Sequence, residues 1–192
     1  MEEFKKALNK GKAFILEPTK AFKAEQKTSF GDAFKYLLTL AIVSSVLTGI
    51  VAAFVVGPVL GLAAIISTYI GFVIGMLIGG IILHIFAWIF GARKGLEQTL
   101  KTVCFASTPA MLLSWIPVIG GIISLYGLVL GVIGLKSFHG LTTERAVLAI
   151  LAPLIIIAVI AAIAFIALFA LLATMPGGLS GLPFDPSAGY PY

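Results

Sequence analysis

Long apolar runs dominate the chain from residue 36 onward, and only short polar or turn-forming stretches separate them. A helix needs about 20 residues to cross the hydrocarbon core of a bilayer, and several runs reach that length. Gly57-Pro58 ends the first run, because proline disfavours helix in the residue before it. The pattern predicts an all-α fold, a polytopic membrane helical bundle of about five transmembrane helices. The predicted spans are approximately residues 36–56, 69–90, 99–116, 119–135 and 146–173.

Two parts of this pattern admit alternative structures. Residues 58–66, "PVLGLAAII", form either an outer connection or an extension of the second span. The run between Lys101 and Lys136 carries no charge, but "SWIPVIGG" interrupts it with turn-forming residues. Each arm has only about 15 residues, so the pair forms either a thin hairpin that crosses fully or a re-entrant loop. Both alternatives return the chain to the side that it left.

Residues 1–35 are predicted to form a basic amphipathic segment that precedes the 36–173 membrane domain. The apolar residues of its first half fall on one side of a helical wheel, and the lysines fall on or beside the other side. This pattern is typical of a short helix that lies on an anionic membrane surface, and Pro18 would end it. The alternative is a solvated charged tail. Residues 174–192, rich in proline and glycine, are predicted to be a disordered external tail.

Composition and charge favour a membrane location. The chain is 60% hydrophobic and 11% charged, with a mean hydropathy of +1.12, whereas soluble domains carry about 25% charged residues. All 13 lysines and arginines fall on one side of the predicted topology. The positive-inside rule then predicts a multi-pass protein of the cell membrane with a cytoplasmic N-terminus and an external C-terminus. Anionic inner-leaflet lipids are the expected partners, and nucleic acid is not, because the basic residues flank the spans.

Few residues in the predicted spans carry chemistry. His84 is the intramembrane ionisable candidate, and a structural hydrogen bond is favoured over a titrating or ligand-binding role. Ser107 and Thr108 add intramembrane hydroxyls that are expected to bond the backbone of their own helix. His139 is expected in a loop, as a turn or interface residue. Because no metal, phosphate or nucleophile motif is present, we predict no catalytic residue, no cofactor and no metal site.

Glycines at four-residue spacing mark candidate packing faces on two spans. Such faces let helix backbones approach closely, which drives helix association in lipid. The favoured interpretation is packing within one bundle, and the alternative is a homo-oligomer interface. The helix-packing candidates are Gly71, Gly75, Gly79, Gly127 and Gly131.

Several motifs occur in a characteristic order. A histidine-containing span ends in the glycine-basic break "GARKG"; "QTL" follows, then the alanine-x-x-proline of "ASTP" and, before the last span, "GLKSFHGL". "EPTKAF", with Pro18 and Phe22, precedes the first span. Over residues 18–173 the chain resembles the Yip domain family, as a compact prokaryotic-type member. The resemblance implies a five-span membrane protein; eukaryotic members interact with Rab (Ypt) GTPases in vesicle traffic, and the family supplies no catalytic residue.

These observations predict a non-enzymatic integral membrane protein that scaffolds partners or organises the membrane through its basic helix and loops. An unidentified membrane or cytoplasmic protein is the expected protein partner. The alternative is a passive small-molecule or ion transporter or channel with a polar path near His84, Ser107 and Thr108; an intramembrane enzyme ranks third. The expected interaction surface comprises Pro18, Phe22, Arg93, Lys94, Lys136, His139 and Gly140.

Overall fold

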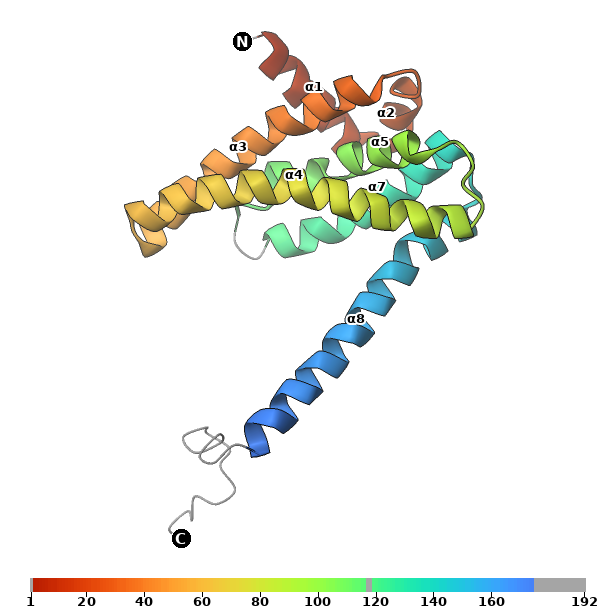
Figure 1. Ribbon diagram of the computed structural model, residues 1–192. Helices are drawn as coiled ribbons and strands as arrows, with labels where there is room; N and C mark the ends of the chain where they lie inside the picture. The colour runs from red at the N-terminus through yellow and green to blue at the C-terminus, as the bar shows by residue number, and fades with distance from the viewer. Residues whose placement is uncertain (1, 117–118, 175–192) are drawn as a thin grey trace, which may run out of the picture. The chain divides into compact units, whose positions relative to one another are not determined.

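The computed structural model describes residues 2–116 and 119–174, and all regular structure in these ranges is helical (Figure 1). In chain order the helices are α1 (Glu2–Leu16), α2 (Pro18–Ala24), α3 (Phe30–Val56), α4 (Pro58–Ile89), α5 (Leu96–Ala106), α6 (Thr108–Leu113), α7 (Ile119–His139) and α8 (Thr143–Thr174). The predicted all-α fold class is confirmed. From residue 175 on, the tail predicted over 174–192 lies outside the described residues.

The helices α3, α4, α7 and α8 are long and apolar enough to cross a bilayer, which is the composition of an integral membrane protein. The chain divides into two compact units, Met1–Pro153 and Leu154–Tyr192. The first unit holds α1 to α7 and the start of α8. Residues 154–174 continue α8 without a charged residue.

The arm predicted over residues 99–116 is divided between two helices. α5 ends at Ala106 and α6 begins at Thr108, with Ser107 between them. Pro109 lies in the first turn of α6, where its missing amide hydrogen and its ring oppose a continuous helix. With 11 and 6 residues, neither piece has the length of a bilayer crossing. The described residues therefore contain four span-length helices and a shorter, two-part arm, instead of five continuous helices.

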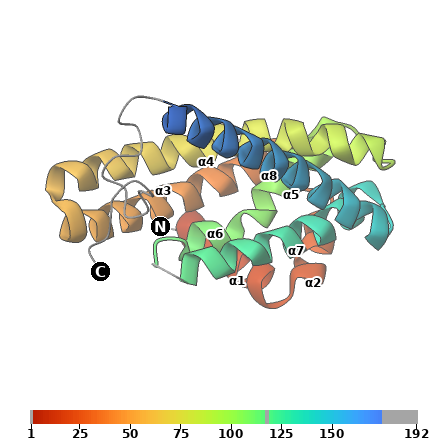
Figure 2. The same cartoon turned by 90° about the horizontal axis from the view of Figure 1, so that it is seen from below.

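Helices α3 and α4 run side by side as an antiparallel hairpin (Figures 1 and 2). Gly57 joins them with a φ of 102°, a left-handed conformation that favours glycine, and Pro58 opens α4. Residues 58–66 are therefore a helix extension. A Cβ added to Gly49 would lie 2.8 Å from the Gly61 carbonyl oxygen, and one added to Gly61 would lie 2.8 Å from that of Gly49. The two glycines let the backbones of α3 and α4 meet.

We expect Gly49→Ala to lower the free energy of unfolding by about 1–3 kcal/mol, because the new methyl group overpacks the α3–α4 contact. The measurement is the thermal unfolding midpoint of the purified protein in mild detergent. The matched control is Gly75→Ala on the same helix hairpin, where an added Cβ meets no described atom within 4 Å. Equal midpoints for the two variants would contradict the close approach at Gly49.

The glycines predicted to pack helices divide into two groups. In α4, a Cβ added to Gly71, Gly75 or Gly79 would meet none of the described atoms within 4 Å. In α7, a Cβ on Gly127 would lie 3.2 Å from the Ala106 carbonyl oxygen, and one on Gly131 would lie 2.9 Å from Ile150 Cδ1. The two α7 glycines therefore lie at close contacts among the described residues. In α4, a Cβ added to Gly80 on a neighbouring face would lie 2.5 Å from Leu100 Cδ2, and the packing role of the Gly71, Gly75 and Gly79 stripe stays a prediction.

The N-terminal segment forms two helices, α1 and α2, that pack against the bundle. α1 contacts α3 and α6, and α2 contacts α7. Gly11 permits this approach, because a Cβ there would lie 2.9 Å from Leu112 Cδ1. The amphipathic helix is present, but Phe14 on its apolar face is fully buried by protein. The sequence alone suggested that lipid would cover that face.

Aromatic side chains form the centre of the first unit. Phe105 of α5 stacks on Phe14 of α1 with ring centroids 4.8 Å apart, and its ring lies 5.5 Å from that of Tyr36 in α3. Phe22 of α2 contacts Phe14 edge-on at 4.9 Å and Phe138 of α7 at 5.7 Å. We call these rings the aromatic cluster; they connect helices that are distant in sequence.

Candidate interaction surface

Exposed lysines and arginines come from segments that contact one another. The Gln26 side chain, after α2, donates to the Ser137 carbonyl at the end of α7 (3.2 Å). The Phe30 amide at the start of α3 donates to Glu97 at the start of α5 (3.3 Å). A Cβ added to Gly140 would lie 3.9 Å from Lys94 Nζ, so the α7–α8 connection lies beside the α4–α5 connection. We define the basic surface as Lys20, Lys23, Lys27, Lys35, Arg93, Lys94, Lys136 and Arg145, all exposed.

Positive charge on the basic surface is only partly neutralised. Lys20 pairs with Glu17 at 2.7 Å, and Lys35 lies 4.0 Å from Asp32. Within the described ranges, no carboxylate oxygen lies within 4.0 Å of the other cations of the surface. Exposed pairs of this kind contribute little to stability, so the charge serves the surface potential more than the fold.

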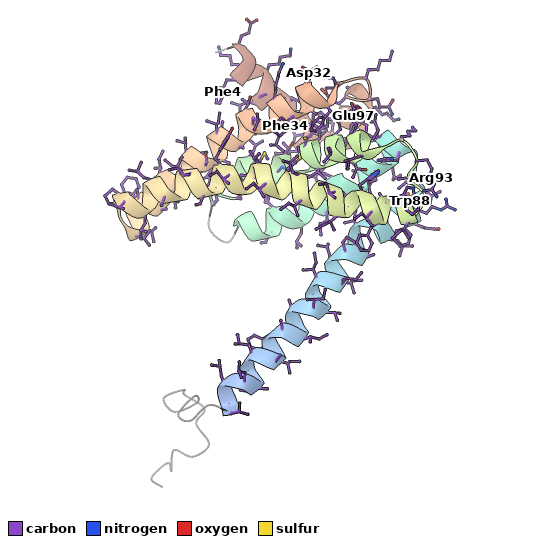
Figure 3. The ribbon with its side chains drawn as sticks, in the orientation of Figure 1. Phe4, Asp32, Phe34, Trp88, Arg93 and Glu97 are labelled. Carbon is purple, nitrogen blue, oxygen red and sulfur yellow. The ribbon has the colours of Figure 1, made fainter. Side chains whose placement is uncertain are left out.

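Arg93 lies against Trp88 at the end of α4 (Figure 3). Its guanidinium carbon is 5.1 Å from the centre of the indole ring, and Nη1 donates to the Trp88 carbonyl oxygen at 2.7 Å. The contact places a cation beside the last carbonyls of a helix, where the helix dipole favours positive charge. An exposed tryptophan that supports an arginine is an arrangement suited to the boundary between lipid and water.

The residues of the expected interaction surface are not all exposed. Lys94 and Lys136 are exposed, Gly140 is exposed after α7, and Pro18 is half-buried at the start of α2. Phe22 and His139 are buried, so their prediction as surface residues was wrong. Phe22 fills the space above Gly134, where an added Cβ would lie 2.9 Å from its ring.

Lys101 holds the α2–α3 connection against α5, a contact that the sequence did not indicate. Its side chain is only 2% exposed, and Nζ donates to the Gln26 carbonyl oxygen at 3.3 Å. The ammonium also lies 4.9 Å from the centre of the Phe138 ring, a cation–π contact. Burial lowers the pKa of Lys101, and the charges of Glu97 and Glu25 partly offset that effect. The α2–α3 connection, which carries Lys27 of the basic surface, is therefore held in place by Lys101.

His84 and His139 meet at one hydroxyl. His84 Nδ1 of α4 and His139 Nε2 of α7 each lie 2.9 Å from Thr99 Oγ1 of α5. His84 thus forms a hydrogen bond to a facing helix, and its partner is a threonine that the sequence analysis missed. Thr99 lies 15 residues from His84 and 40 residues from His139, so no local sequence pattern indicates this contact.

The intramembrane hydroxyls are satisfied separately from this histidine contact. Ser107 Oγ donates to the Val103 carbonyl oxygen at 2.8 Å, and Thr108 Oγ1 donates to that of Phe105 at 2.6 Å. Thr108 Oγ1 also lies 2.9 Å from the Tyr36 hydroxyl. Within the part of the chain that the structure describes, no hydrogen bond joins His84 to Ser107 or Thr108. Among the described residues, the hydrogen bonds of His84 and those of the two hydroxyls therefore form separate sets.

Comparison with protein families matches residues 12–166 to the Yip1 domain. Neither the curated proteins nor the solved structures give a match. The matched range begins inside α1, includes the aromatic cluster and the basic surface, and ends inside α8. It therefore covers most of the chain and the same motifs that carried the resemblance. This chain belongs to the Yip1 domain family of membrane proteins.

Proposed function

We propose that this chain is a non-enzymatic scaffold of the membrane, which uses its basic surface to hold anionic lipid and a protein partner with an acidic face. The observation that carries the proposal is a set of cations that have no carboxylate partner among the described residues and lie on segments that contact one another. Lys101, Gln26 and Glu97 fix these segments, so the charges keep a defined arrangement. A fixed charge pattern favours selective association more than a flexible basic tail does.

The proposal includes an orientation. The positive-inside rule assigns the basic surface and the N-terminus to the cytoplasm and the C-terminus to the outside. Anionic phospholipids of the inner leaflet then face the surface, and each lysine or arginine near them contributes about 1 kcal/mol. The Arg93–Trp88 contact also favours a position of the basic surface at the boundary between lipid and water, because tryptophan is enriched at that boundary.

We expect Lys27→Glu combined with Lys94→Glu to reduce association with partner and anionic lipid several-fold. Both side chains are exposed and form no hydrogen bond or ion pair among the described residues, so the fold remains. The measurement is quantitative mass spectrometry of proteins and lipids that co-purify from native membranes in mild detergent. The matched control reverses Lys5 and Lys12 of α1, which are also exposed. Unchanged association in the Lys27/Lys94 variant would count against the proposal.

A further inference from the structure

A groove of about 390 Å³ lies between α2 and α7. It is lined by Thr19, Lys23, Gln26, Ile133, Lys136 and Ser137. Both lysines are exposed, neither pairs with a carboxylate among the described residues, and none of the lining residues is acidic. The groove therefore concentrates positive charge in a hollow, where an anion gains more than on a flat surface.

Polar groups around the groove are arranged as donors. Gln26 Nε2 donates to Ser137 Oγ at 3.3 Å, which leaves the Ser137 hydroxyl hydrogen free to point into the groove. Lys136 Nζ donates to Thr143 Oγ1 at 2.7 Å, and its remaining ammonium hydrogens are available. Ammonium and hydroxyl donors around one hollow suit the oxygens of a phosphate group.

An apolar stripe on α7 leads away from the groove. Ile122, Leu125 and Val129 are 69%, 64% and 50% exposed. Their spacing of three and four residues continues through Ile133 to Lys136, so all share one helix face. At 1.5 Å per residue, the stripe from Ile122 to Lys136 is about 21 Å long. This length is enough for an acyl chain to contact the stripe across one leaflet. A free phosphate ion would not contact the stripe.

We propose that this groove binds the headgroup phosphate of an anionic phospholipid, with an acyl chain along the α7 stripe. The inference deepens the proposed function, on which it rests for the orientation of the groove toward an anionic leaflet. Bound in this way, the lipid bridges α2 and α7 and reinforces the contact between Gln26 and Ser137. One lipid molecule is then a structural part of the basic surface.

The test compares Lys23→Gln/Lys136→Gln with the matched control Lys27→Gln/Lys94→Gln, which removes the same charge from the basic surface outside the groove. The purified full-length protein in non-ionic detergent is titrated with dioleoyl phosphatidic acid, and bound lipid is counted by native mass spectrometry. We expect about 30-fold weaker binding in the groove variant, since each lysine contributes about 1 kcal/mol. The control is expected to stay within about threefold of the native chain, because neither of its lysines lines the groove.

Further arms distinguish the ligand and protect against loss of fold. Dioleoyl phosphatidylcholine is expected to bind more weakly than phosphatidic acid, and Lys23→Arg/Lys136→Arg is expected to retain binding at an unchanged unfolding midpoint. Equal lipid binding by the groove and control variants would overturn the proposal. Displacement of the lipid by inorganic phosphate at equal concentration would also overturn it, in favour of a free-anion site. If the groove variant keeps its lipid while Lys27→Glu/Lys94→Glu loses partner and lipid association, the proposed function stands without the groove.

Discussion

Replacing Phe105 by alanine is expected to lower the free energy of unfolding by about 3–5 kcal/mol, the range for a buried phenylalanine. Phe105 is fully buried in α5 and lies at the centre of the aromatic cluster. Its ring contacts those of Phe14, Tyr36 and Phe138, which belong to α1, α3 and α7. The cavity would therefore weaken several helix contacts at once. The measurement is the unfolding midpoint in detergent together with the rate of proteolysis within α1.

The matched control is Phe4→Ala, because Phe4 belongs to α1 but is 44% exposed (Figure 3). It loses little protein contact and is expected to change the midpoint only slightly. Phe105→Leu fills part of the cavity and should fall between the two. A Phe105→Ala protein as stable as the Phe4→Ala protein, with α1 equally resistant to protease, would show that the aromatic cluster does not hold α1 on the bundle.

The aromatic cluster also shows which part of the fold can be derived from sequence. The apolar period of α1 placed Phe14 on an apolar face, and Pro18 marked the end of that helix. The period does not say what covers the face. Protein covers it here, because Gly11 admits Leu112 and because Phe22 and Phe105 supply rings at contact distance. The contacts of Gly11 with Leu112 and of Phe14 with Phe105 join residues about a hundred positions apart, and a single sequence carries no signal for them.

The glycines illustrate the same limit. Regular spacing identified Gly71, Gly75 and Gly79, yet the backbone contact between α3 and α4 uses Gly49 and Gly61. Regularly spaced glycines indicate that one face of a helix is flat. Whether a second helix packs on that face depends on which helix lies opposite and on the position of the contact along the helix axis. The effect of Gly57-Pro58 on the backbone is local, so the sequence indicates the turn between α3 and α4 directly.

The position of a lysine in the sequence does not by itself show whether its side chain is exposed. Lys101 lies between apolar runs, and its position in the sequence predicts a flanking cation on the side of the basic residues. In the fold its long side chain is buried under Phe138 and donates to the Gln26 carbonyl. A lysine near a span end can extend to water or turn inward to a carbonyl, and only the neighbouring helices decide. The basic surface could thus be outlined from sequence, but not the anchor that holds it.

Thr99→Val is the second variant with a large expected effect, because it removes the one hydroxyl that serves both histidines. Valine has nearly the same shape, so the change isolates the hydrogen bonds. His84 Nδ1 and His139 Nε2 would each lose a partner at 2.9 Å. An unsatisfied buried polar group costs about 1–3 kcal/mol, and we expect a total loss of about 2–4 kcal/mol since His84 is half-exposed.

The geometry also assigns the ring hydrogens. His139 Nδ1 is buried without a hydrogen-bond partner among the described residues. A buried N–H without an acceptor is rarer than an unused acceptor, so for neutral rings the His139 hydrogen belongs on Nε2, which donates to Thr99. The single Thr99 hydroxyl hydrogen then points to His84 Nδ1, and His84 carries its own hydrogen on Nε2. Nitrogen NMR shifts of the two rings are expected to report the Nε2–H tautomer for both.

Thr39→Val provides the matched control for Thr99→Val. Thr39 Oγ1 donates to the Lys35 carbonyl oxygen of its own helix at 2.9 Å, and an exposed intrahelical bond of this kind contributes little. Thr99→Ser keeps the hydroxyl and should recover most of the stability and both tautomers. If Thr99→Val unfolds at the same temperature as Thr39→Val and leaves the histidine shifts unchanged, α4, α5 and α7 are held together by packing alone. A selective loss at Thr99 means that a hydroxyl between two imidazoles joins these three helices beneath the basic surface.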